Sequence, residues 1–367
     1  MDRSELKMLQ ALPLDIKIAK TKLRIKDAIN EWGVDGVYIP VSGGMDSTVL
    51  SYIVEEYQKE NGIKKSRIPR INVNTGCEYD GVLTNARKLS DREMLPKKPL
   101  YKVLTEEGYP VGSKKVSRML RDIQNPTENN KATVNLYLTG IKKDGTETKH
   151  FKLAQKWRKF IDSPVKASEK CCYYLKKEPM HRYEKETKRH PLIAEMASEG
   201  GAREGSYLKT GCNAFKTGKS KPMGFWLHKD VLAYVILNNV EYPKEYGEIV
   251  YKGTNIKPTK EDLAEKIKKG INFDLDTTLE KRTGCVYCTF GVTMEKGENR
   301  FQRLKKLDPR KYNFAIYGGK IENGRLVPSK GLGMKYVLDL MGIKYDIDNE
   351  EIEDQISIFD EEVNNEI

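Results

Sequence analysis

The sequence predicts an α/β protein with a doubly wound, mostly parallel sheet. An apolar strand at 37–41 leads through a glycine turn into a helix, which is the start of a βαβ unit. Two further apolar segments, 71–73 and 191–197, also end in polar, glycine-rich residues. Ligands of doubly wound sheets bind at the carboxyl ends of their strands, so we expect these polar ends to share one rim.

The first helix is expected at residues 14–32, and we take 1–34 as an N-terminal helical segment. Apolar residues recur there at helical spacing, and Gly33 follows as a stop. A nucleotide-binding α/β domain is expected at 35–250, followed by a C-terminal region at 251–344. An acidic tail, 345–367, ends the chain.

The glycine turn after the first strand reads Ser42-Gly-Gly-Met-Asp-Ser47. Two glycines allow the backbone to approach a ligand closely, and the start of the next helix supplies N–H groups and a positive dipole end. The turn lacks the Gly-Lys-Ser/Thr ending of a Walker loop. The sequence therefore predicts a different phosphate-binding loop here; a glycine-rich βα turn without a ligand is the alternative.

A β-hairpin insertion is expected at about 132–153. Thr133 to Thr139 alternates between polar and apolar residues, Lys143-Asp-Gly145 provides a turn, and Thr146 to Phe151 alternates again. Four helices are expected at 226–238, 260–269, 301–307 and 334–342.

The chain is basic, with a net charge of +12 over 367 residues. The tail from Tyr345 onward holds ten Asp/Glu and no Lys/Arg, so the preceding residues carry +22. Such a body attracts polyanions, and DNA, RNA or phosphorylated small molecules are the expected partners; a lysine-rich surface without a partner is the alternative. No apolar run reaches membrane-spanning length and no signal-peptide core is present, so we expect a cytoplasmic protein without membrane contact.

Four of the six cysteines form two motifs, Cys171-Cys172 and Cys285-x-x-Cys288. Adjacent cysteines point in different directions, which suits the separate irons of a [4Fe–4S] cluster better than a single zinc ion. Two buried apolar side chains are the alternative for the adjacent pair. Cys77 and Cys212 belong to neither motif.

Five motifs in one order resemble the phosphoadenosine phosphosulfate reductase family, over roughly residues 30 to 345. They are Ser42-Gly-Gly-Met-Asp-Ser47, Asn74-Thr-Gly-Cys-Glu78, Cys171-Cys-x-x-x-Lys-Lys-Glu-Pro179, Met196-Ala-Ser-Glu-x-x-x-Arg203 and Gly284-Cys-x-x-Cys288. The chain looks most similar to the iron–sulfur branch, which includes adenylyl-sulfate reductases and the ATP pyrophosphatases of DNA phosphorothioation.

The resemblance implies an adenine nucleotide alpha-hydrolase-like fold, with a cysteine-bearing helical region at its C-terminal end. ATP or a related adenine nucleotide, with Mg²⁺ as an added expectation, would lie against Ser42, Gly43, Gly44, Asp46, Ser47, Asn74, Thr75, Gly76 and Glu78. Asp46, Ser47, Glu199 and Arg203 are expected to be catalytic. Cys171, Cys172, Cys285 and Cys288 would hold a [4Fe–4S] cluster.

The resemblance implies an ATP pyrophosphatase that activates a substrate, with nucleic acid as a candidate, for sulfur transfer. A cysteine desulfurase would then donate the sulfur. Thioredoxin-dependent reduction of adenylyl sulfate or phosphoadenylyl sulfate is the first alternative, and a non-catalytic binding module with a structural cluster is the second.

The sequence departs from the family at two places. Met45 stands where ATP-cleaving members often have Lys, and no cysteine follows Cys288, where assimilatory reductases carry their nucleophile. The tail segment Gln355-Ile-Ser-Ile-Phe359 also resembles peptides that bind the bacterial sliding clamp; a last packed strand or helical turn is the alternative.

Overall fold

The structure is a computed structural model that describes residues 2–346. It contains two compact units: unit 1 is Met1–Leu100 with Cys172–Cys285, and unit 2 is Tyr101–Cys171 with Val286–Ile367. The sliding-clamp peptide predicted at Gln355–Phe359 lies outside the described residues. No helix in the described part of the chain has both the length and the apolar character that crossing a membrane requires.

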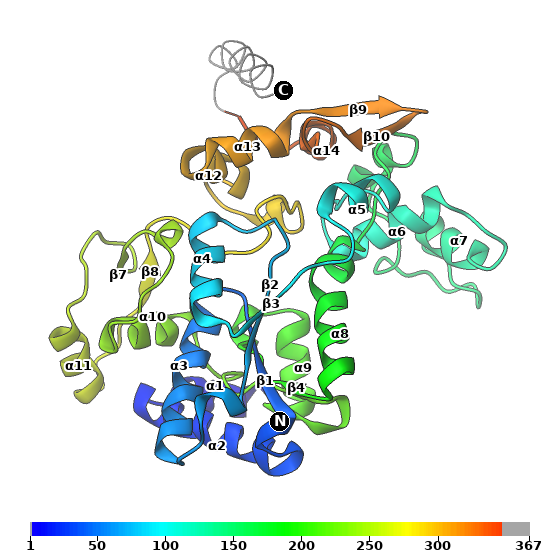
Figure 1. Cartoon of the computed structure of the whole chain (residues 1–367). Coiled ribbons are helices and arrows are strands. Elements are labelled where there is room, and N and C mark those ends of the chain that lie inside the picture. Colours follow the sequence, from blue (N-terminus) through cyan, green and yellow to red (C-terminus); the bar gives the residue numbers. More distant parts are fainter. Residues whose placement is uncertain (1, 347–367) are drawn as a thin grey trace. The chain divides into compact units, whose positions relative to one another are not determined.

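Unit 1 contains the central sheet and most of the helices (Figure 1). Its helices are α1 (Arg3–Gln10), α2 (Leu14–Trp32), α3 (Met45–Glu60), α4 (Asp80–Leu89), α8 (Glu178–Thr187), α9 (Ala202–Thr210), α10 (His228–Leu237) and α11 (Lys260–Lys268). Its strands are β1 (Val37–Val41), β2 (Arg70–Val73), β3 (Arg92–Met94), β4 (His190–Pro191), β5 (Asn213–Ala214), β6 (Lys219–Ser220), β7 (Ile249–Tyr251) and β8 (Leu275–Thr277).

Unit 2 is mainly helical. Its elements are α5 (Leu100–Glu106), which starts at the unit boundary, α6 (Lys114–Gln124), α7 (Lys131–Thr139), α12 (Arg300–Leu307), α13 (Pro309–Ile316), β9 (Gly319–Glu322), β10 (Arg325–Pro328) and α14 (Met334–Met341). Strands β9 and β10 pair antiparallel.

The central sheet confirms the prediction of a parallel α/β fold. Its order is β3-β2-β1-β4, and all three pairings are parallel. Ile39 pairs with Arg70, and Val37 pairs with His190 on the other side of β1. The βαβ unit predicted to start with the strand at 37–41 is therefore present as β1, α3 and β2.

Helices cover both faces of this sheet, as expected for a doubly wound fold. Alternate residues of β1 point to opposite faces. Val37, Ile39 and Val41 join the main core with residues of α2, α3 and α10. Tyr38 instead packs on Tyr183 of α8, with 4.9 Å between ring centroids. Figure 1 shows β1 lying between α3 and α8.

The strand order reverses at β1. The chain proceeds from β1 to β2 to β3 in one direction, and then adds β4 on the opposite side of β1. The loops that leave β1 and β4 diverge at such a point and open a crevice at the carboxyl edge of the sheet. The predicted loop 42–44 follows β1, and Glu199 follows β4 along the chain.

The β-hairpin predicted at about 132–153 is wrong. Residues Lys131–Thr139 form helix α7, which ends at Gly140 in the left-handed conformation. Only one antiparallel bridge, Ile141 to Glu147, forms in the described part of this segment. The alternation of polar and apolar residues is ambiguous in this segment. Val134 and Leu138 are four residues apart, so they also share one face of a helix.

The strand predicted at 191–197 is also shorter than expected. Regular pairing covers His190–Pro191, after which Leu192 forms an isolated parallel bridge to Ser220. The backbone of Leu192 still bonds β1, since its N–H donates to the Tyr38 carbonyl at 2.8 Å. The segment therefore follows the edge of the sheet before it turns toward α9.

Candidate active site

Both glycines of loop 42–44 are required by their surroundings. Gly43 has φ +78°, and an added Cβ would lie 2.0 Å from the Val82 carbonyl oxygen of α4. A Cβ on Gly44 would lie 3.0 Å from the hydroxyl oxygens of Tyr246 and Thr283. The loop is therefore packed between α4 and two side chains from distant segments.

Hydrogen bonds within the loop fix its shape. The Ser47 hydroxyl accepts from the Ser42 N–H at 3.1 Å and donates to the Gly44 carbonyl at 3.0 Å. Asn85 of α4 donates to the Gly43 carbonyl at 2.9 Å. Ser47 is buried and holds the turn, whereas Ser42 is exposed. The N-cap residue Gly44 has no side chain to cap α3, so the helix start keeps the positive end of its dipole at this loop.

Met45 does not face the loop mouth. Its side chain is 1% exposed and belongs to the main hydrophobic core. At the loop, its backbone N–H donates to the Tyr246 hydroxyl at 3.2 Å. Position 45 therefore serves packing in this chain, and any positive charge for a phosphate must come from other residues.

Asp46 lies on the first turn of α3 among charged neighbours. Burial raises the pKa of its carboxyl, and the positive charges of His228 and Arg203 partly oppose that rise. His228 begins α10, and its Nε2 atom is buried with no hydrogen-bond partner among residues 2–346. Burial also raises the pKa of Tyr246 to about 12, with the negative charge of Asp46 adding to the effect.

Glu199 brings two arginines together beside the strand end. Its side chain is 7% exposed, and it forms ion pairs with both Arg203 and Arg282. Its carboxylate also accepts from the Met196 N–H at 3.1 Å. The arginine side chains remain 46% and 54% exposed, so a buried carboxylate orients two guanidinium groups that still face solvent. Such a pair suits phosphate oxygens.

The loop after β2 is closed by Glu78. Its carboxylate accepts from the Thr75 hydroxyl at 2.6 Å and from the Thr75 and Cys77 N–H groups at 3.2 Å. The Asn74 side chain accepts from the Gly76 N–H at 3.0 Å. The polar groups of Thr75 and Glu78 thus bond one another, and these four predicted residues form one compact turn.

Lys176 lies near Glu78 and two motif cysteines within unit 1. The side chain of Lys176 is exposed. Desolvation of its ammonium group lowers the pKa, but the attraction of Cys285, Glu78, Cys172 and Cys77 outweighs this effect, so the pKa of Lys176 is raised. Lys176 lies in a π-helical turn, Tyr173–Lys177, directly after Cys172. Turns of this kind are frequent at functional sites.

An N–H group and a lysine lie near cysteines of the two motifs. Cys285 and Cys288 flank a turn, and the Phe290 N–H donates to the Cys288 sulfur at 3.4 Å. Amide bonds to sulfur and nearby positive charge favour thiolates. The donor chemistry fits a thiolate-bound cluster, although no three His, Cys, Asp or Glu side chains of the described residues gather as a metal site.

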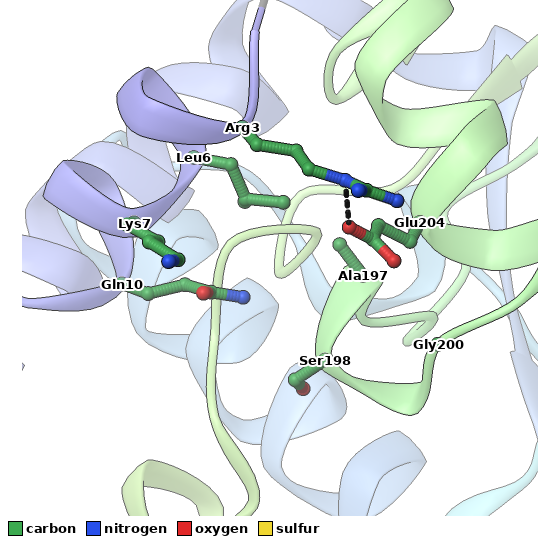
Figure 2. Close-up of a pocket in the computed structure, with 8 residues that line it drawn as sticks. All are labelled: Arg3, Leu6, Lys7, Gln10, Ala197, Ser198, Gly200 and Glu204. Carbon is green, nitrogen blue, oxygen red and sulfur yellow. Dashed lines mark hydrogen bonds and ion pairs between the residues drawn. The ribbon is translucent and has the colours of Figure 1, made fainter.

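A small pocket lies close to Glu199 in the chain (Figure 2). Its volume is about 180 Å³, and α1 and the segment 197–204 line it. Arg3 donates to the Glu204 carboxylate at 3.0 Å across one side, and Lys7 adds a second cation. Glu199 and Arg203 do not line this pocket, so it is a neighbour of the predicted site.

Sequence reasoning missed three contributors to the site. The hydroxyl groups of Tyr246 and Thr283 are hydrogen-bonded to each other at 2.9 Å and lie against Gly44, but neither residue belongs to a motif. His228 is one of four histidines in the sequence, and no second histidine stands near it at metal-ligand spacing. No local signal identifies these residues, because each reaches the loop from a segment roughly 180 to 240 positions away.

Comparisons with known proteins leave the chain without an assigned family. No protein-family model matches it. No curated protein matches its sequence either. Any function must therefore be inferred from the residues of the site and their geometry.

Proposed function

We propose that the chain binds ATP or a related adenine nucleotide, with the phosphates at loop 42–44 and the first turn of α3. One observation carries this proposal: the glycine loop leaves β1 at the point where the strand order reverses. The two glycines place no side chains at this turn, and the positive dipole end of α3 favours anions. The family resemblance of the five motifs supports the same assignment.

The proposed reaction is attack of a substrate oxygen on the α-phosphorus of ATP. A bond forms between that oxygen and phosphorus, the bond to the bridging α–β oxygen breaks, and pyrophosphate leaves. Arg203 and Arg282, held by Glu199, would neutralise the charge that develops on the phosphates. Asp46 would orient the phosphates through Mg²⁺ or position the attacking group. The product adenylate is the activated species that sulfur transfer requires.

We propose that Cys171, Cys172, Cys285 and Cys288 hold a [4Fe–4S] cluster. Two of these cysteines, Cys172 and Cys285, interact electrostatically with the positive charge of Lys176. When bound, the cluster would supply a site for sulfur or electron transfer, or a structural anchor. Lys176 would balance part of the negative charge of the thiolates.

Reduction of a sulfonucleotide is less well supported. That reaction needs an accessible thiolate that attacks sulfur and is later released by thioredoxin. The two cysteines outside the motifs are both buried, Cys77 fully and Cys212 with 7% exposure. Burial also raises the pKa of the Cys212 thiol, which disfavours the reactive thiolate.

The nucleotide proposal is tested by binding and product analysis on the full chain. We expect ATP to bind and pyrophosphate to be released once a substrate is supplied. Arg282→Gln should weaken nucleotide binding by about tenfold or more, as loss of a charge-assisted phosphate contact predicts. Arg310→Gln is the matched control, because it changes an arginine of unit 2. Sulfite release from adenylyl sulfate without ATP cleavage would favour the reductase instead.

The cluster proposal is tested by anaerobic purification. We expect about four irons and four sulfides per chain, a brown colour, and loss of iron in the Cys172→Ser and Cys285→Ser variants. Cys212→Ser should keep its iron, because Cys212 lies outside both motifs. A colourless protein that contains one zinc ion would contradict the assignment.

A further inference from the structure

Positive charge is concentrated in unit 2. Its described residues, 101–171 and 286–346, contain 27 Lys/Arg against 14 Asp/Glu. Unit 1 is larger but contains only 38 Lys/Arg against 30 Asp/Glu. Within unit 2, residues 131–159 alone hold eight Lys/Arg and two Asp/Glu. We call this segment the basic arm.

The basic arm is folded rather than extended. After α7, the loop returns on the helix: the Thr148 N–H donates to the Gly140 carbonyl and the Leu153 N–H to the Tyr137 carbonyl, both at 2.7 Å. Figure 1 shows α7 beside α6 in unit 2. The backbone therefore holds its lysines in a defined arrangement.

The end of the arm is anchored in the core of unit 2. Trp157 is 6% exposed and lies against Gly112, where an added Cβ would meet the indole at 2.6 Å. Arg158 donates to the Leu138 carbonyl and so links the anchor to α7. A pre-organised surface loses less conformational entropy when it binds a partner.

Six lysines of the basic arm carry charge that the protein does not neutralise. All are exposed, and none forms an ion pair with a carboxylate in the described residues: Lys142, Lys143, Lys149, Lys152, Lys156 and Lys159. Of the arm's two acidic side chains, Asp144 accepts hydrogen bonds from Thr146. The neighbouring helix α6 differs, because Arg118 and Arg121 both pair with Glu169.

The chemistry of the arm indicates which polyanion it fits. Lysines are point charges that contact phosphates without reading bases. Single strands usually need exposed aromatic rings for base stacking. Phe151 is 42% exposed, but Lys115 lies over its ring, 5.5 Å from the centroid. A double helix offers the densest row of phosphates and the largest gain from counterion release.

We propose that the basic arm binds the phosphate backbone of a double-helical nucleic acid, independently of sequence. This function goes beyond the proposed ATP chemistry, whose residues belong to unit 1. The arm requires neither ATP nor an iron–sulfur cluster to bind, so the two proposals can fail separately.

The test is binding of the full chain to a fluorescent duplex without nucleotide, at salt concentrations from about 50 to 200 mM. DNA and RNA duplexes of one sequence are compared with the corresponding single strands. The test variant changes the six lysines to Gln. We expect the slope of log affinity against log salt to fall by about 3 to 5, and affinity at low salt to fall by about 100-fold or more.

The matched control also removes six charges, but from unit 1. It changes six exposed lysines without an ion pair in the described residues to Gln: Lys26, Lys64, Lys185, Lys209, Lys216 and Lys268. Both variants are first shown to unfold at the wild-type temperature. The proposal is supported if the control variant keeps duplex binding and the arm variant loses it. Of the DNA and RNA duplexes, the one that binds with higher affinity identifies the partner. Equal losses in both variants, no duplex binding, or tighter binding of single strands would overturn it.

Discussion

Gly43 illustrates how one residue determines the shape of the proposed phosphate loop. We predict that Gly43→Ala unfolds the loop, because the new Cβ would combine left-handed backbone strain with a 2.0 Å contact to the Val82 carbonyl. The strain alone costs about 1–2 kcal/mol, and the clash should add about as much again. Urea denaturation and ATP titration measure the two effects.

The control for this change is Gly62→Ala. Gly62 has φ +66°, but an added Cβ would meet nothing within 4 Å. It should therefore cost only the strain and leave nucleotide binding intact. Equal losses of stability in the two variants would show that the contact with α4 is unimportant.

Asp46 is expected to reduce stability while supporting function. Burial raises the pKa of Asp46 in the folded protein above its ordinary value near about 4. The stabilisation that comes from protonating Asp46 is therefore fully present below about pH 4, and it is lost as the pH rises through the pKa of the folded protein. At neutral pH this half-buried carboxylate is therefore destabilising. Asp46→Asn should increase the free energy of unfolding at pH 7, and this gain should shrink toward pH 4.

The same variant should lose about 100-fold or more in ATP-dependent turnover, as removal of a group that stabilises transferring phosphate predicts. Unfolding curves from pH 4 to 8, read together with pyrophosphate release, separate the two effects. A variant that is less stable at pH 7 would show that the attraction of His228 and Arg203 exceeds the cost of burial.

Helices α2 and α10 are joined by a buried ion pair. Lys17 and Asp230 are 2.5 Å apart, with side chains 1% and 9% exposed. Burial lowers the pKa of Lys17 and raises that of Asp230, while each partner opposes the shift of the other. Asp230 also accepts from the Leu227 N–H at 2.7 Å, at the start of the helix that carries His228.

We predict that Lys17→Met destabilises the protein by about 3–5 kcal/mol, because it leaves Asp230 buried without its cation. Arg24→Met is the control on the same helix. Arg24 pairs with Asp27 at 3.2 Å, and both side chains are more than 40% exposed, so this change should cost less than about 1 kcal/mol. Guanidinium denaturation measures both; similar small losses would mean that Asp230 is neutral in the folded protein.

At the scale of the whole molecule, the acidic tail should weaken polyanion binding. Residues 347–367 contain nine Asp/Glu and no Lys/Arg, so their removal raises the net charge from +12 to +21. We predict severalfold tighter duplex binding at low salt, with the difference vanishing at high salt as charges are screened. A full-length variant with the nine acids changed to amides should behave like the truncation. Unchanged affinity in both would contradict a long-range electrostatic effect.

Local sequence predicted much of the central sheet and its glycine loop. The strand at Val37–Val41 and the helix at Leu14–Trp32 begin and end close to the expected residues. The prediction of this strand and this helix depends on the spacing of apolar residues and on the glycine that follows each, and these signals extend over only a few residues. The same reasoning failed at Lys131–Thr139, where one apolar pattern suits both a strand and a helix.

Local sequence specified the strand, glycine loop and helix of the proposed phosphate site, the parallel sheet, the cysteine motifs and the basic charge. The surroundings of that loop depend on the tertiary fold, which places Tyr246 and Thr283 against Gly44 and His228 near Asp46. The tertiary fold also buries the Met45 side chain in the core and pairs Glu199 with two arginines. These contacts join residues far apart in the chain, and they form because packing around the sheet brings distant segments together.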